Sequence, residues 1–191
     1  MSGIIGSRLN TRGSGVIGSL GTDGQVLTSA GAGLSAAHEN IVVTSGKVLQ
    51  LISNTTTSEK STSSTNWVDG NLTCTITPSS TNNKIVCMLS TTTRIDDANV
   101  GGALGIDRSG GASGNGTLGG QTYGLCRNHY PSFNENDNSH SDDNPAAITY
   151  LDSPSVTTAV VYKFQFKAVS GTYYVQTGST TSSLVVMEIE A

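Results

Sequence analysis

The chain has 191 residues, of which only 13% are charged, and its formal net charge is −4 at pH 7. At roughly 100–200 residues per domain, this length has room for one domain and an appendage, but not for two full domains. The ten basic residues are scattered, so the chain lacks the clustered Lys and Arg that neutralise phosphates, and we expect no nucleic-acid partner.

Residues 1–34 are rich in glycine and nearly free of charge. They hold three aliphatic pairs, and the sequence GIIGS at residues 3–7 is echoed by GVIGS at 15–19. Ordering so much glycine is costly in backbone entropy, so we predict an extended arm that becomes ordered only on another surface. Chance repetition is the alternative reading of the echo. Residues 35–46 predict a hinge, which gives an arm and hinge over residues 1–46 and a compact domain over 47–191.

The next third of the chain predicts short strands separated by turns. Residues 48–52 are strand-like, the Ser/Thr tract at 54–66 favours edge or irregular structure, and Trp67 is expected to plug the core or its rim. Apolar residues alternate with polar ones over 71–77, which is typical of a half-buried strand. Residues 85–89 are apolar on both faces and predict a central strand covered on both sides.

The three cysteines have no C-x-x-C spacing, which argues against a zinc site or a disulfide framework. Small buried apolar side chains are the favoured interpretation. However, Cys74 and Cys87 are symmetric about Ser80–Thr81, so a regular hairpin at that turn would place them opposite each other, close enough for oxidation in air.

Two polar stretches, 108–121 and 127–145, are predicted as long surface loops with a short strand at 122–126 between them. The last third is regular. Residues 162–168 alternate apolar and polar side chains, and the closing strand has Val185, Met187 and Ile189 on one face. Its other face has Leu184 and Val186 before it turns acidic at Glu188. Many short strands without crossover helices predict an all-β fold, an antiparallel β-sandwich or jelly roll.

No arrangement of residues predicts catalysis or a cofactor. The histidines His38, His129 and His140 are not accompanied by a G-x-S-x-G elbow, and the acidic residues near the last two are interpreted as a solvated loop rather than as metal ligands. Phosphate-binding glycine motifs are missing as well. No apolar run approaches the roughly 18 residues of a membrane span, and Met1 is not followed by signal-peptide features. We therefore expect no enzyme, no cofactor and no membrane partner.

Five stretches together resemble virion structural proteins of marine tailed bacteriophages. They are MSGIIG at the N-terminus, LGTDGQVLTSAGAG at 20–33, TITPSST at 75–81, TYLDSP at 149–154 and LVVMEI at 184–189. The GTDGQVLTS motif recurs in phage fibre and appendage proteins, so it indicates the class better than the part. The resemblance implies an N-terminal attachment segment and a β-rich C-terminal domain that is commonly trimeric.

Two virion roles and one enzymatic role follow as hypotheses. The first is a homotrimeric capsid decoration or cement protein, assembled in the host cytoplasm, whose arm docks on the major capsid protein or another virion protein. The second is a short tail fibre or appendage that binds a host receptor or surface glycan. The third, a virion-borne glycan hydrolase, lacks a site. Small size and the absence of a fibrous shaft favour the first.

These hypotheses assign three sets of residues. The predicted virion-attachment residues are Ile4, Ile5, Val16, Ile17, Val26 and Leu27. The predicted trimer interface is Leu184 and Val186, and the predicted receptor-facing loop contains His129, Tyr130, Phe133 and His140.

Overall fold

The computed structural model describes residues 22, 25–28, 37–40, 46–95, 100–112, 114–129 and 142–191. The chain divides into two compact units, Met1–Thr44 and Ser45–Ala191. In the first unit, β1 (Gln25–Thr28) pairs antiparallel with β2 (Ala37–Asn40) as a two-stranded sheet. Part of the segment predicted as a hinge is therefore a strand, because β1 supplies a partner for its backbone.

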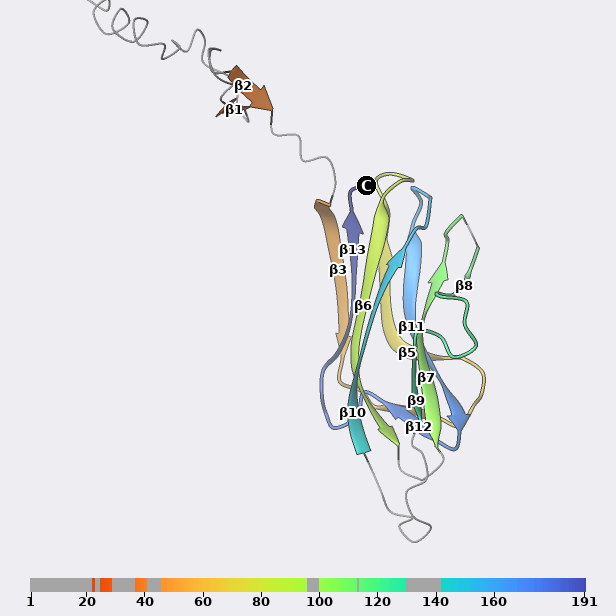
Figure 1. Cartoon of the computed structure of the whole chain (residues 1–191). Coiled ribbons are helices and arrows are strands. Elements are labelled where there is room, and N and C mark those ends of the chain that lie inside the picture. The colour runs from red at the N-terminus through yellow and green to blue at the C-terminus, as the bar shows by residue number, and fades with distance from the viewer. Residues whose placement is uncertain are drawn as a thin grey trace, which may run out of the picture. The chain divides into compact units, whose positions relative to one another are not determined.

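The second unit is an antiparallel β-sandwich of two sheets (Figure 1). The first sheet has the order β3 (Val48–Thr56), β13 (Ser182–Ile189), β6 (Lys84–Ile95), β12 (Tyr173–Val175), β4 (Lys60–Thr62), with β10 (Asp142–Asp152) also paired to β6. The second sheet has the order β5 (Val68–Ile76), β11 (Val160–Ser170), β7 (Gly101–Ser109), β8 (Gly116–Thr117), with β9 (Cys126–His129) also paired to β7. The all-β prediction is confirmed, whereas jelly-roll connectivity stays a prediction.

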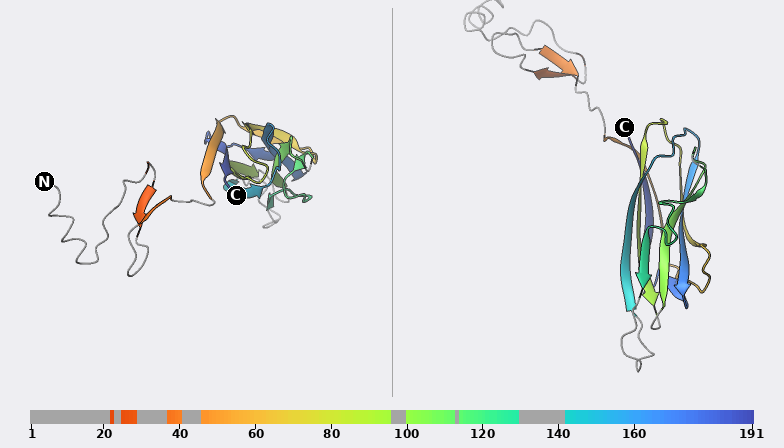
Figure 2. Two further views of the ribbon diagram at one scale, coloured as in Figure 1. Left: turned by 90° about the horizontal axis from the view of Figure 1, so that it is seen from above. Right: turned by 45° about the vertical axis from the view of Figure 1, so that its right-hand side comes forward.

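The first sheet is four strands wide along most of β6. β10 runs along β6 from Ile85 to Ile95. On the opposite edge of β6, β13 pairs with Lys84–Ser90 and β12 with Thr93–Ile95. The two layers of the sandwich can be followed in Figure 2.

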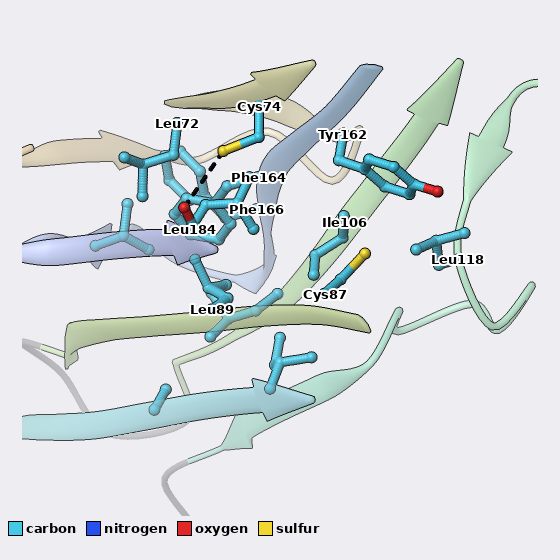
Figure 3. Packing of buried hydrophobic residues seen from close by; sticks show 14 of the residues in the cluster. Leu72, Cys74, Cys87, Leu89, Ile106, Leu118, Tyr162, Phe164, Phe166 and Leu184 are labelled. Atoms are coloured by element: carbon cyan, nitrogen blue, oxygen red, sulfur yellow. Dashed lines mark hydrogen bonds between the residues drawn. The ribbon is translucent and has the colours of Figure 1, made fainter. Parts of the chain in front are cut away.

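Alternation of apolar and polar residues builds the core between the sheets. Along β11 every second residue is buried, with Tyr162, Phe164 and Phe166 facing inward. Figure 3 shows Phe164 and Phe166 packed beside Leu72 of β5 and Leu184 of β13. The largest rings fit because glycines lie beneath them: Phe164 lies on Gly70, where a Cβ would overlap the ring.

The turn at Ser80–Thr81 does not close a hairpin, so the arrangement that would place Cys74 opposite Cys87 on neighbouring strands is not formed. β5 pairs with β11 in the second sheet, whereas β6 lies in the first sheet, so the turn between them carries the chain across the sandwich. Cys74 is therefore in the second sheet and Cys87 in the first. Both side chains are buried in the core between the sheets as free thiols. The Cys74 Sγ donates to the carbonyl oxygen of Leu184 at 3.3 Å (Figure 3). Burial raises the pKa of both thiols.

The strand predicted at residues 85–89 is central, since β6 has neighbours on both edges. Within the part of the chain that the structure describes, only one of its faces is covered: Ile85, Cys87 and Leu89 are buried, whereas Met88 is 43% exposed. The predicted long loops are shorter than expected, because β7 continues to Ser109 and β10 begins at Asp142. The strand expected at 122–126 begins only at Cys126, after a turn.

Candidate functional site

The structure places the predicted site residues in different situations. Ile4, Ile5, Val16 and Ile17 lie outside the described residues, as do Tyr130, Phe133 and His140. Val26 and Leu27 are in β1, where they are 41% and 45% exposed. His129 is the last residue of β9.

The two residues assigned to a trimer interface are not accessible to another subunit. Leu184 and Val186 have no exposed surface, because they point from β13 into the core of the sandwich. The assignment to this face of β13 therefore does not fit the structure. The outward positions of the strand are Val185, Met187 and Ile189, all of which are half-buried.

The outward side of the first sheet has apolar side chains in cross-strand register. One row takes one residue from each of four strands: Leu51, Met187, Val86 and Leu151. Two residues along, the next row is Ser53, Val185, Met88 and Thr149. On the other side of the first row, Val48 lies opposite Ile189. We call the outward residues of these rows the apolar sheet face.

Several large apolar side chains of the apolar sheet face are exposed to solvent. Leu151 is 60% exposed, Leu51 55% and Val48 51%. A sheet of which one face packs on a core normally has polar residues on the other face. Contiguous exposed apolar patches of this kind mark interaction sites on soluble proteins.

Charged residues occur only at the two ends of this face. At one end Lys84 donates to Ser153 Oγ at 3.0 Å. At the other end Arg94 lies 3.1 Å from a Glu59 carboxylate oxygen and 4.2 Å above the Tyr174 ring, and it is opposite Asp143 in the register. The two rows between these ends contain no charged residue, so another apolar surface could cover them without burying a charge.

A buried polar cluster joins the two sheets at one end of the sandwich. Arg108 of β7 donates to both carboxylate oxygens of Asp152 of β10, at 2.8 and 3.1 Å. The Tyr162 hydroxyl donates to the same carboxylate at 2.7 Å. Burial, followed by the bond and charge of Asp152, raises the pKa of Tyr162 far above its usual range. The charges of Arg108 and Asp152 balance, and the hydrogen bonds of the cluster connect the two sheets.

A cavity of about 390 Å³ adjoins this cluster. Its walls are residues 114–119, residues 150–153 and Arg108. The Asp152 carboxylate in this lining already accepts hydrogen bonds from Arg108 and Tyr162. Among the described residues that line the cavity, this carboxylate is therefore not free to act as a general base.

Glu188 forms a second buried polar cluster at the end of β13. Its side chain has no exposed surface. It accepts hydrogen bonds from Gln50 Nε2 at 2.5 Å, from Asn83 Nδ2 at 2.6 Å, and from the Ser79 amide and hydroxyl at 2.6 and 2.8 Å. Burial alone raises the pKa of this carboxyl, but these bonds outweigh it and bring the pKa to about 2. Glu188 thus fixes the turn that crosses between the sheets.

Within the residues that the structure describes, no three His, Cys, Asp or Glu side chains gather as a metal site. The same residues contain no helix long and apolar enough to cross a membrane. No model of a known protein family matches the chain, and comparison with curated proteins finds no match.

Sequence reasoning missed both polar clusters and most of the apolar sheet face. The burial of Glu188 could have been predicted, because Glu188 lies on the same face of the closing strand as Leu184 and Val186. The exposure of Leu51 and Leu151 was not, since it depends on which strands become neighbours.

Proposed function

We propose that the protein is a non-enzymatic structural component of a tailed-phage virion, a homotrimeric capsid decoration protein. The observation that carries this proposal is the apolar sheet face, whose two uncharged rows cross four strands. Such a surface is costly to leave in water, because each buried Å² of apolar surface is worth roughly 25 cal/mol. A trimer covers it with the same face of two other copies, and no charge has to be desolvated in its middle.

The buried titratable groups support a structural role. Asp152 and Arg108 neutralise each other, and the Glu188 carboxylate is saturated by four hydrogen bonds. Burial raises the pKa values of Cys74 and Cys87, which keeps both thiols protonated and unreactive near neutral pH. These groups hold strands together and are not poised to exchange protons.

The first unit supports the attachment part of the proposal. A two-stranded sheet is marginally stable by itself in water, and β1–β2 presents Val26 and Leu27 to solvent. Docking on the major capsid protein or another virion protein would cover these two side chains. In this proposal the sandwich then projects from the particle.

Cryo-electron microscopy of the assembled particle tests the proposal. Density for three copies at capsid three-fold positions is the expected result. A few copies restricted to the tail vertex would contradict the decoration role and support the alternative, a tail appendage that binds a host receptor. A variant that lacks residues 1–34 should remain a folded trimer and fail to enter particles.

A further inference from the structure

The first sheet has two long strands with an unpaired edge. Within the described part of the chain, β3 pairs only with β13, and β10 pairs only with β6. β3 extends over nine residues and β10 over eleven. Unpaired edges of this length are templates for pairing with another chain, so proteins usually protect them.

The protein does protect the corresponding edge of the second sheet. β5 has an irregular register near Asp69, and Asn71 has a positive φ of 62°. Three carbonyl oxygens of β5 and the one of Thr77, just after the strand, accept hydrogen bonds from side chains. The pairs are Asp69 with Lys60, Gly70 with Gln176, Thr73 with Asn54 and Thr77 with Gln50. Among the described residues, no side chain donates in this way to the backbone of β3.

The two unpaired edges are compatible with each other. β3 contains no charged residue, and the acidic residues of β10 are at its two ends, so the central residues would meet without like charges facing each other. β3 is antiparallel to β13, β13 to β6, and β6 to β10. β3 and β10 therefore run in opposite directions, and rotation about an axis along the strands preserves this relation between copies.

We infer that the first sheets of three copies close into a ring, in which β3 of each copy pairs antiparallel with β10 of the next. The apolar sheet face then lines the interior of the ring. This inference rests on the trimer proposed above and adds to it a backbone contact between subunits. Closure pairs the free edges of both long strands, and closure of a sheet is the most complete protection that its edges can have.

The width of the sheet favours three copies. Neighbouring strands are roughly 4.8 Å apart, so four strands make a side about 19 Å wide. Three such sides place each sheet about 5–6 Å from the three-fold axis, close to half of the roughly 10 Å between packed sheets. Four copies would leave each sheet about 9–10 Å from the axis and a hole between them. Two copies stacked as flat sheets, face to face, would leave β3 and β10 unpaired, because stacked sheets are roughly 10 Å apart.

Cysteine cross-linking in the full chain tests the strand pairing. Ser53 and Thr149 are exposed, belong to one row, and lie on the two edge strands. In a Cys126→Ser background, Ser53→Cys is combined with Thr149→Cys, Ala147→Cys or Leu151→Cys, one partner in each variant. Three partners are needed because closing a sheet into a ring shifts the register between its edge strands. Each protein is mildly oxidised and run on a denaturing gel without reductant, and the unoxidised sample is sedimented.

The inference predicts covalent trimers for one of the three double variants, and only single chains for every variant with one introduced cysteine. Cross-linked dimers of the variant with Ser53→Cys alone would show that β3 pairs with a second β3, and would overturn the inference. Trimers in sedimentation without cross-links in any register would overturn the strand pairing but leave the trimer intact. Monomers in sedimentation would contradict the proposed trimer itself.

Discussion

Replacement of Glu188 by Gln tests whether a buried carboxylate fixes the turn between the two sheets. The pKa of Glu188 falls from 4.5 to about 2 in the folded protein. At about 1.4 kcal/mol per pKa unit, the ionised form contributes about 3 kcal/mol to the free energy of unfolding. Because the folded pKa is lowered, this contribution is complete above pH 4.5 and is lost as the pH falls towards 2.

The assay is urea unfolding of the full chain at one protein concentration, followed by the fluorescence of Trp67, the only tryptophan. We expect Glu188→Gln to lower the free energy of unfolding by about 3 kcal/mol at pH 7 and by much less near pH 2. Glu190→Gln is the matched control, since Glu190 is two residues away and partly exposed. An equal loss for Glu188→Gln at both pH values would refute the reasoning.

Three further variants test the core, the apolar sheet face and the buried Arg108–Asp152 pair separately. Leu184→Ala should lower the free energy of unfolding by about 2–5 kcal/mol, because it leaves a cavity in the core. Val185→Ala, at the neighbouring outward position, should mainly weaken the trimer. Urea denaturation measures the first effect and sedimentation the second, and similar effects of the two variants would contradict the assignment of faces. Arg108→Met should cost about 3–5 kcal/mol, because it leaves Asp152 buried without its partner, and unchanged urea denaturation would argue against the ion pair. In native protein, alkylation read by mass spectrometry should label half-buried Cys126 before the two core cysteines, and simultaneous labelling would show that the core opens readily.

The sequence was sufficient for the fold class because strand periodicity is a local property. The alternation around Leu72 and around Phe164 predicted the inward faces of β5 and β11 correctly. The failure at Cys74 and Cys87 arose because a turn between two strands looks the same whether it closes a hairpin or crosses to the other sheet.

The candidate site was harder to predict for a similar reason. The closing strand is apolar on both faces, and its residues alone could not show which face the chain would bury. The choice depends on β11 and β5, which cover Leu184 and leave Met187 outside. Glu188 likewise depends on donors, Gln50 and Asn83, that are distant in the sequence.

The most direct test of the account is the mass of the protein in solution with and without charge on the apolar sheet face. Sedimentation equilibrium of the wild-type chain should give three chain masses. A variant with Leu51→Lys and Met88→Lys should sediment as a folded single chain, because both side chains point outward and are 55% and 43% exposed. A wild-type protein that is monomeric at micromolar concentration, or a charged variant that remains trimeric, would contradict the assignment of this face to the subunit interface.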